Sequence, residues 1–532
     1  MKKTLPCLLF TAAVVIAQEQ VYCQKNTMAD GPFSPSWESL SAYEVPEWFK
    51  DAKFGIWAHW GPQCQPEAGD WYARAMYEEG SRAYKHHLSH YGHPSEVGFK
   101  DVMNEWKAEN WEPRKLMALY KRTGARYFMA LGNHHDNMDL WDSPYQSWNS
   151  VRIGPHRDIL AEWKAAADEE GLPFGVSIHS AHAWTWYEPS QGADRTGEKA
   201  GISYDARTLR KADGKGKWWE GLDPEELYVQ NHSLSNSTEH FWDWPEGVSK
   251  PSQAYLDNFY NRTTQMMDAY HPDLVYFDDS WLPFWPIDST GLEVVAHYYN
   301  VSAAREKGKP EVVVFGKKLT PYHSHAIVRD VEKGVLDSAQ TIPWQTCTCL
   351  GNWHYDADVY NENRYKSAET VIQMLIDIVS KNGNLLLSVP LRGDGTIDDK
   401  EEVILAEIGE WLKINGEGIY ATRPWKIFGE GPSTSISKPL DGPGFNEQRD
   451  QPYTSEDIRF TTKGDFLYAH VMTRPDDGHL CIKSLKGLKV RSVEMLGEGK
   501  VKFKSVKDGL SVRIPSSSKP GPSSITLKIK LG

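Results

Sequence analysis

The sequence predicts a (β/α)8-like barrel followed by a C-terminal antiparallel β-sandwich, and three observations lead to this prediction. The 532 residues exceed the length of one ordinary domain. From about residue 50, short apolar runs alternate with stretches of helical periodicity, as in parallel strands covered on both faces. After about residue 428, the chain is rich in Gly, Pro, Ser and Thr and has short strands, which is typical of a sandwich of roughly 100 residues.

Six barrel strands are predicted directly from apolar runs, at residues 53–59, 125–131, 173–179, 273–279, 311–315 and 383–389. Amphipathic helical patterns lie between them, and the two remaining strands have no clear apolar run. An open, doubly wound sheet would alternate in the same way, but no Gly-rich phosphate loop follows the first strand. We therefore predict a barrel over residues 30–425 and a sandwich over residues 426–532.

Charge and composition narrow the class of function. The formal net charge is −13, which argues against a nucleic-acid-binding protein because such proteins present a basic face. Residues 1–17 place Lys2 and Lys3 before a short apolar run that ends in small residues, which predicts a secretory signal peptide. We thus expect an exported protein, periplasmic or secreted, and no later segment has the pattern of a membrane span.

Polar side chains follow the predicted strands at their C-terminal ends, where barrels of this kind hold their active sites. These side chains are His59, His134, His135, His179, His182, Asp278 and Asp279. An acid after an apolar strand is costly unless it is solvated, hydrogen-bonded or functional, so Asp278 is either catalytic or a helix cap or arginine partner. Asp279 should point to the opposite side if the strand continues.

Aromatic residues interleave with these polar positions, in a chain that has 22 tryptophans. Aromatic rings stack on the apolar faces of sugars, and Trp71 and Trp281 are predicted to contact one, although about half of the tryptophans near these positions should belong to the core. Cleavage of a glycosidic bond also needs two carboxyl groups. The combination favours a carbohydrate-active enzyme.

A histidine-rich stretch, HHLSHYGH, contains His86, His90 and His93 at spacings that suit one helical face. A metal site there is an alternative, but no cysteine or carboxylate completes an evident zinc set. We expect a polar helix or loop near the pocket rim, with no metal and no cofactor.

Several segments in order resemble the α-L-fucosidases of glycoside hydrolase family 29, and together they span about residues 45–425. Among them are WFKDAKFGIWAHWG (48–61), GDWYARAMY (69–77), GARYFMALGNHHDNMDLWDSPYQSWN (124–149), PDLVYFDDSW (272–281) and GNLLLSVPLRGDGTI (383–397). The resemblance implies a retaining exo-hydrolase that releases terminal α-L-fucose from an oligosaccharide or polysaccharide. It also implies a (β/α)8-like catalytic domain followed by a β-sandwich.

The resemblance places the nucleophile on Asp278 and, at the best-matching position, the acid/base on Glu332, which could otherwise be a surface charge or a helix-start acid. It also implies that several residues line the fucose pocket, namely His59, Trp71, His134 and His135.

Three departures from the family pattern bear on the sugar that is bound. Asp70 replaces the usual Glu, His179 and His182 stand where Tyr is frequent, and FGKK (315–318) replaces an arginine. A pocket that hydrogen-bonds the extra C6 hydroxyl of L-galactose would discriminate against fucose. An α-L-galactosidase acting on an algal or other L-galactose-containing polysaccharide therefore stays open as an alternative, as does a catalytically silent glycan-binding protein.

Overall fold

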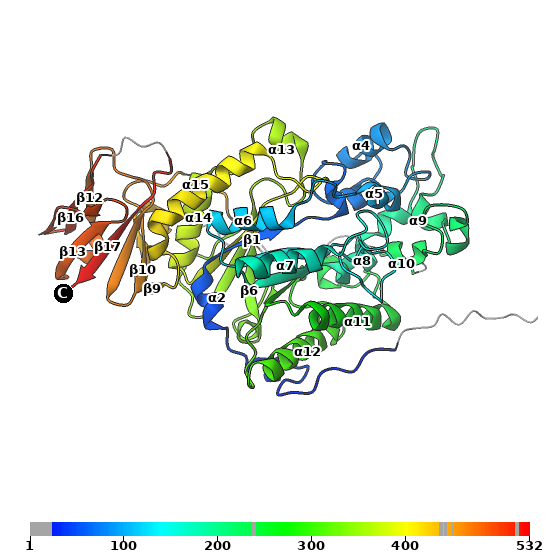
Figure 1. The fold of residues 1–532 in the computed structure, drawn as a ribbon, viewed down its shortest axis with the longest axis horizontal. Helices are drawn as coiled ribbons and strands as arrows, with labels where there is room; N and C mark the ends of the chain where they lie inside the picture. The colour runs from blue at the N-terminus through cyan, green and yellow to red at the C-terminus, as the bar shows by residue number, and fades with distance from the viewer. Residues whose placement is uncertain are drawn as a thin grey trace, which may run out of the picture.

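Eight parallel strands close into a barrel in chain order, which confirms the predicted fold class (Figure 1). The computed structural model describes residues 24–230, 232–236, 241–435, 440, 444–449, 451–516 and 521–532. The barrel strands are β1 (Phe54–Ala58), β2 (Phe128–Asn133), β3 (Phe174–Ile178), β4 (Leu274–Phe277), β5 (Val313–Gly316), β6 (Val328–Glu332), β7 (Trp344–Cys349) and β8 (Gly383–Ser388). Parallel pairing of β1 with β8 closes the ring.

The helices of the described residues are α1 (Trp37–Leu40), α2 (Glu47–Ala52), α3 (Tyr72–Ala75), α4 (Arg82–His90), α5 (Phe99–Glu105), α6 (Pro113–Thr123), α7 (Ile159–Glu170), α8 (Ala183–Trp186), α9 (Asp205–Thr208), α10 (Pro224–Tyr228), α11 (Gln253–Tyr270), α12 (Thr290–Arg305), α13 (Ala357–Asn361), α14 (Ala368–Ser380) and α15 (Asp399–Asn415). The long helices, among them α6, α7, α11, α12 and α14, lie around the barrel, and α4, α5, α9 and α10 lie together at one end of the molecule (Figure 1). Local sequence sets their ends: α6 begins at Pro113, which has no N–H to leave unpaired, and stops at Gly124 in a left-handed conformation.

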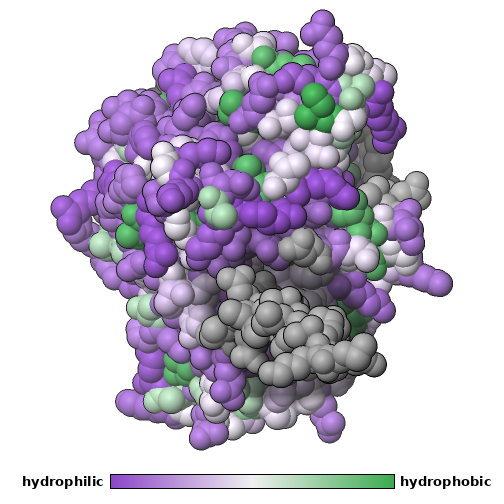
Figure 2. Space-filling model, turned by 90° about the vertical axis from the view of Figure 1, so that its right-hand side faces the viewer, coloured by the Kyte–Doolittle hydropathy of each residue, from purple (hydrophilic) through white to green (hydrophobic). Residues whose placement is uncertain are grey.

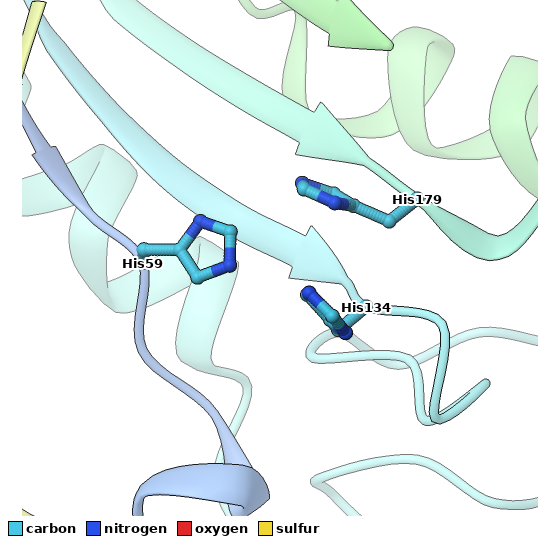
Figure 3. Close-up of side chains that lie close together, drawn as sticks. All are labelled: His59, His134 and His179. Atoms are coloured by element: carbon cyan, nitrogen blue, oxygen red, sulfur yellow. The ribbon is translucent and has the colours of Figure 1, made fainter. Parts of the chain in front are cut away.

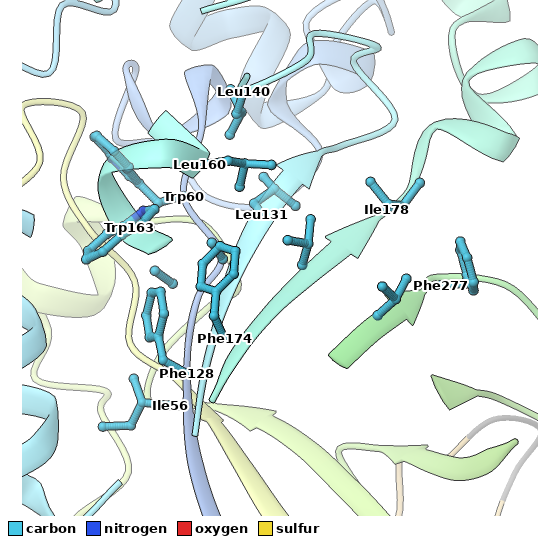
Figure 4. Close-up of a cluster of buried hydrophobic side chains, with 14 of the residues drawn as sticks. Ile56, Trp60, Phe128, Leu131, Leu140, Leu160, Trp163, Phe174, Ile178 and Phe277 are labelled. Carbon is cyan, nitrogen blue, oxygen red and sulfur yellow. The ribbon is translucent and has the colours of Figure 1, made fainter. Parts of the chain in front are cut away.

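Alternate residues of each strand face two different cores. Outward-facing side chains such as Phe128 and Phe174 pack against helices. The ring centroids of Phe128 and of Trp163 on α7 lie 4.8 Å apart (Figure 4). Inward-facing side chains, among them Trp57 and Tyr276, form a separate cluster inside the barrel. This alternation is what a closed barrel requires of its strands, and it fixes which residues reach the barrel's ends.

The two strands without an apolar run are β6 and β7, and they carry a buried polar network. The Gln345 side chain donates to Asp330 at 3.0 Å and accepts from the Tyr127 hydroxyl at 2.9 Å. Burial raises the pKa of Asp330 to about 6. These hydrogen bonds satisfy polar groups that would otherwise be costly inside the barrel.

Two antiparallel sheets follow the barrel, in agreement with the predicted second fold. One has the strand order β14-β13-β17-β11-β10-β9 and the other β12-β16-β15. Their strands are β9 (Arg423–Glu430), β10 (Ile458–Lys463), β11 (Phe466–Val471), β12 (His479–Ile482), β13 (Val490–Met495), β14 (Gly499–Lys500), β15 (Phe503–Val506), β16 (Gly509–Arg513) and β17 (Ile525–Leu531). The predicted domain division at 425/426 stays a prediction, and β9 crosses it.

A buried ion cluster joins the sheets to the barrel. Asp377 on α14 accepts from Lys381 at 2.7 Å and from Arg459 on β10 at 2.5 Å. All three side chains are at most 3% exposed. Breaking such a buried pair typically costs about 3–5 kcal/mol, so the contact holds β10 firmly against α14.

The predicted signal peptide, residues 1–17, lies outside the described residues. Among the helices of the described residues, none combines the length and apolar character needed to cross a bilayer. Figure 2 shows the end of the molecule near α9 and α10, where hydrophilic residues dominate and hydrophobic ones form small, separate groups. Such scattered groups are normal on a protein surface.

Candidate active site

A cavity of about 350 Å³ opens at the C-terminal ends of the barrel strands. It is lined by Trp57, His59, Asp70, Trp71, His134, His179, Trp242, Tyr276, Asp278, Asp279, Ser280, Lys317, Lys318, Glu332, Trp353, His354 and Phe445. Several of the polar members follow a strand directly: His59 follows β1, His134 follows β2, and Asp278 follows β4. The barrel topology therefore gathers residues that are far apart in the chain.

Asp278 receives hydrogen bonds on both carboxylate oxygens. Oδ2 lies 3.1 Å from His135 Nε2 and 3.2 Å from His179 Nδ1, and Oδ1 accepts from the Lys317 ammonium. Burial by itself raises the pKa of the Asp278 carboxyl, but Lys317 and the two histidines outweigh it and hold this pKa well below its usual value. Asp278 is thus an ionised, oriented carboxylate at neutral pH.

Lys317 follows β5 and lies between two carboxylates. Its Nζ is 2.6 Å from Glu332 Oε2 and also hydrogen-bonds Asp278 Oδ1. Burial lowers the pKa of the ammonium, but the two carboxylates outweigh burial and raise this pKa well above its usual value. Because one ammonium contacts both oxygens, they lie at most about 5 Å apart, the spacing of retaining rather than inverting glycosidases.

Three histidines, His59, His134 and His179, follow the first three strands and point toward one another across the cavity (Figure 3). His59 makes no hydrogen bond through either ring nitrogen within the described structure, and Nε2 of His179 likewise has none. Burial lowers the pKa of His179 to about 4 and that of His59 well below its usual value. Neutral imidazoles with unpaired nitrogens, buried beside a cavity, suit the hydroxyl groups of an uncharged sugar.

The same side chains lie close enough to raise the question of a metal. The ring nitrogens of His59, His134 and His179 fall within 4.8 Å of one another, as do ligand atoms of His135, His179 and Asp278. However, the Gln63 amide donates to His134 Nδ1 at 2.7 Å, so the proton of neutral His134 sits on Nε2. A protonated Nε2 donates a hydrogen bond and offers no lone pair to a metal. The first of these two sets, which contains His134, therefore fits a hydroxyl better than a cation.

The structure brings together most of the residues predicted to bind substrate. His59, Asp70, Trp71, His134 and His179 all line the cavity. Asp70 also accepts a hydrogen bond from the backbone of His354 at 2.8 Å, which holds the shorter acid in place.

Three predicted residues do not line the cavity. His135 is fully buried behind Asp278, and its Nδ1 donates to the His179 carbonyl at 2.6 Å. His182 is equally buried, and its Nε2 lies 2.8 Å from Asp279 Oδ1. Trp281 is partly buried and packs against the core. These three positions are suited to orienting the cavity wall, and their direct contact with substrate stays a prediction.

The histidines of the HHLSHYGH stretch lie outside the cavity lining. His86 and His90 stack with their ring centroids 4.0 Å apart on α4. His93 lies against Asp194, with Nε2 2.8 Å from Oδ2. They do not converge, so this stretch forms a polar helix and turn.

Several cavity residues were not identified as functional from the sequence, among them Lys317, His354 and Phe445. Lys317 was visible only as part of the FGKK departure. His354 lies after β7. Because β7 has no apolar run, its end could not be located in the sequence, and no polar residue after it was singled out. Phe445 belongs to the segment before the second domain's main strands, and its sequence carries no signal of cavity contact.

Comparison with known proteins agrees with this geometry. Residues 20–417 match the family described as alpha-L-fucosidase, and residues 448–530 match the alpha-L-fucosidase C-terminal domain. The chain is 26% identical to human tissue alpha-L-fucosidase over 98% of this chain and 97% of the human one. The rat tissue enzyme is 26% identical over 95% and 94% of the two chains.

Among solved structures, the Thermotoga maritima alpha-fucosidase in complex with a mechanism-based inhibitor is similar, with a TM-score of 0.68 at 25% identity. The alignment covers 94% of this chain and 100% of the Thermotoga chain. Both the barrel and the following sheets are thus shared with fucosidases. With a family match over three quarters of its length, this chain belongs to the α-L-fucosidase family and is a glycoside hydrolase.

Proposed function

We propose that this protein is an exo-acting α-L-fucosidase that works by double displacement, with Asp278 as the nucleophile and Glu332 as the acid/base. One observation carries the assignment: a single ammonium, that of Lys317, hydrogen-bonds both carboxylates. This contact sets the carboxyl spacing that retention needs. The small cavity, open at one end of the barrel, suits one terminal sugar better than an internal segment of a polysaccharide.

In the first step, a carboxylate oxygen of Asp278 attacks the anomeric carbon while Glu332 gives its proton to the glycosidic oxygen. The bond from C1 to that oxygen breaks, its electrons leave with the alcohol, and a fucosyl ester forms on Asp278. In the second step, Glu332 takes a proton from water, the water oxygen attacks C1, and Asp278 leaves as a carboxylate. The two inversions give overall retention.

Lys317 stays paired through both steps. In the free enzyme its ammonium contacts both carboxylates. Once Asp278 is a neutral ester, Glu332 is the carboxylate that remains in contact with the ammonium. Lys317 therefore holds Glu332 in place in the first step and in the second.

The test is hydrolysis of paired aryl α-L-fucoside and aryl α-L-galactoside substrates by the purified enzyme, with the first-formed anomer followed by proton NMR. We expect preference for the fucoside and release of α-L-fucose before mutarotation. Preference for the galactoside would overturn the sugar assignment, and initial release of the β-anomer would overturn the double displacement.

We also infer that the chain is exported, because Lys2 and Lys3 precede a short apolar run that ends at Ala17. Expression of the full-length gene should yield a mature protein whose intact mass lacks residues 1–17 or a few more. A cell-retained protein that keeps Met1 to Ala17 would contradict this.

A further inference from the structure

Phe445 is an aromatic residue of the C-terminal part of the chain that lines the mouth of the catalytic cavity. It is 57% exposed, among the most exposed large hydrophobic residues described. Its backbone is also left-handed, with φ of 66°, a conformation that bulky side chains rarely adopt. An exposed ring held in a strained backbone next to a cavity calls for a functional explanation.

Several hydrogen bonds fix the segment that carries Phe445 beside the acid/base. The Phe445 N–H donates to the Glu332 carbonyl at 2.7 Å, and the Glu447 N–H donates to the Lys333 carbonyl at 3.0 Å. Asn446 accepts from the Val335 N–H at 2.7 Å and donates to the Val335 carbonyl at 3.1 Å. The segment 444–447 therefore runs along the chain that leaves β6, directly beside Glu332.

The close approach of these two segments depends on glycine. A Cβ on Gly444 would lie 1.8 Å from the Glu332 carbonyl oxygen, and one on Gly334 would lie 2.7 Å from Asn446 Oδ1. A side chain at either position would push the two segments apart. The sequence thus provides for a tight contact that places the aromatic ring at the cavity mouth.

The position of Glu332 tells which part of a substrate would meet this ring. A general acid must reach the glycosidic oxygen, so the leaving group lies next to Glu332 and outside the fucose pocket. Phe445 is joined to Glu332 by a backbone hydrogen bond and borders the same opening. Its exposed face is apolar, and the C–H face of a pyranose ring stacks on such a surface.

We propose that Phe445 forms a leaving-group subsite that binds the sugar ring to which fucose is attached. The proposal rests on the fucosidase function and adds a substrate class to it: a fucose linked to a pyranose whose apolar face meets this ring. Trp71, which is 38% exposed, borders the same cavity and offers a second aromatic surface. The subsite favours fucosylated di- and oligosaccharides over fucosides that have small leaving groups.

The experiment compares two substrates that differ in the leaving group. One is α-L-fucosyl fluoride, whose leaving group has no ring, and the other is the best substrate in a panel of (1→2)-, (1→3)-, (1→4)- and (1→6)-linked α-L-fucosyl-galactose disaccharides. For Phe445→Ala, we expect the ratio of kcat/KM for the disaccharide to that for the fluoride to fall about 3- to 10-fold. Phe445→Trp should restore the ratio because it restores a stacking surface.

Tyr322→Ala is the matched control, because Tyr322 is 52% exposed and does not line the cavity. Its substrate ratio should equal that of the wild type, and thermal unfolding should confirm that both alanine variants are folded. An unchanged ratio in Phe445→Ala, or equal losses on both substrates, would overturn the subsite. Failure of the wild-type enzyme to hydrolyse the fluoride would instead overturn the proposed function and the subsite with it.

Discussion

Replacement of Asp278 by glycine is expected to lower kcat on an aryl α-L-fucoside by at least about 10⁴-fold, because the variant lacks the carboxylate that forms the fucosyl ester. The loss should be measured by steady-state kinetics on the purified variant. The shortened side chain also leaves room for a small anion beside C1. Added azide should therefore restore part of the turnover and yield β-L-fucosyl azide, since azide attacks once, with inversion.

The neighbouring acid provides the control. Asp279 borders the cavity but pairs with His182, so Asp279→Asn should lose far less activity and should not respond to azide. If Asp278→Gly kept more than about a tenth of the wild-type kcat, Asp278 would not be the nucleophile.

Lys317→Met should lower kcat/KM by about 10²- to 10³-fold and should move the acidic limb of its pH profile to higher pH. The Lys317 ammonium is a main cause of the lowered pKa of Asp278. Activity needs ionised Asp278, so it is present above that pKa and is lost as the pH falls through it. Without the ammonium the pKa rises, and the loss of activity begins at a higher pH.

Lys317→Arg separates charge from shape in this prediction. The guanidinium keeps the positive charge, so the acidic limb should stay near that of the wild type even if kcat falls through altered geometry. An acidic limb that stays in place in Lys317→Met, measured between pH 3 and 8, would show that Lys317 does not control Asp278.

The architecture was predictable wherever strands are uniformly apolar. Strands such as β4 and β8 are buried on both faces by apolar side chains, and their sequences read as apolar runs. β6 and β7 could not be found in this way, because Asp330, Gln345 and Thr348 occupy them. Their polar groups are satisfied by partners that exist only once the barrel closes, among them the Tyr127 hydroxyl.

The site residues that could be predicted are those that come directly after strands with an apolar sequence. His59, His134, His179 and Asp278 were found by their place after apolar runs, and the structure brings them together around one cavity. Lys317 was harder to recognise, because a lysine beside two acids is meaningful only in three dimensions. Phe445 could not be found, because its contact with Glu332 joins residues more than a hundred positions apart.

The two alternative functions, an α-L-galactosidase and a silent glycan-binding protein, have less support than fucose release. The family matches and the fucosidase structures support fucose release and do not favour an L-galactose-specific enzyme. A silent binding protein has no need for two carboxylates held by one buried ammonium. The departures at Asp70 and His179 are accommodated within a cavity that keeps both carboxylates.

The most direct test of Asp278 as a covalent nucleophile is trapping of the intermediate with 2-deoxy-2-fluoro-α-L-fucosyl fluoride. The 2-fluoro group slows both steps, and the fluoride leaving group keeps the first step faster than the second, so the ester accumulates. Mass spectrometry of a peptic digest should locate a single fluorofucosyl group on Asp278. A fluorofucosyl group on another carboxylate, or turnover of the reagent without any covalent adduct, would contradict the assignment.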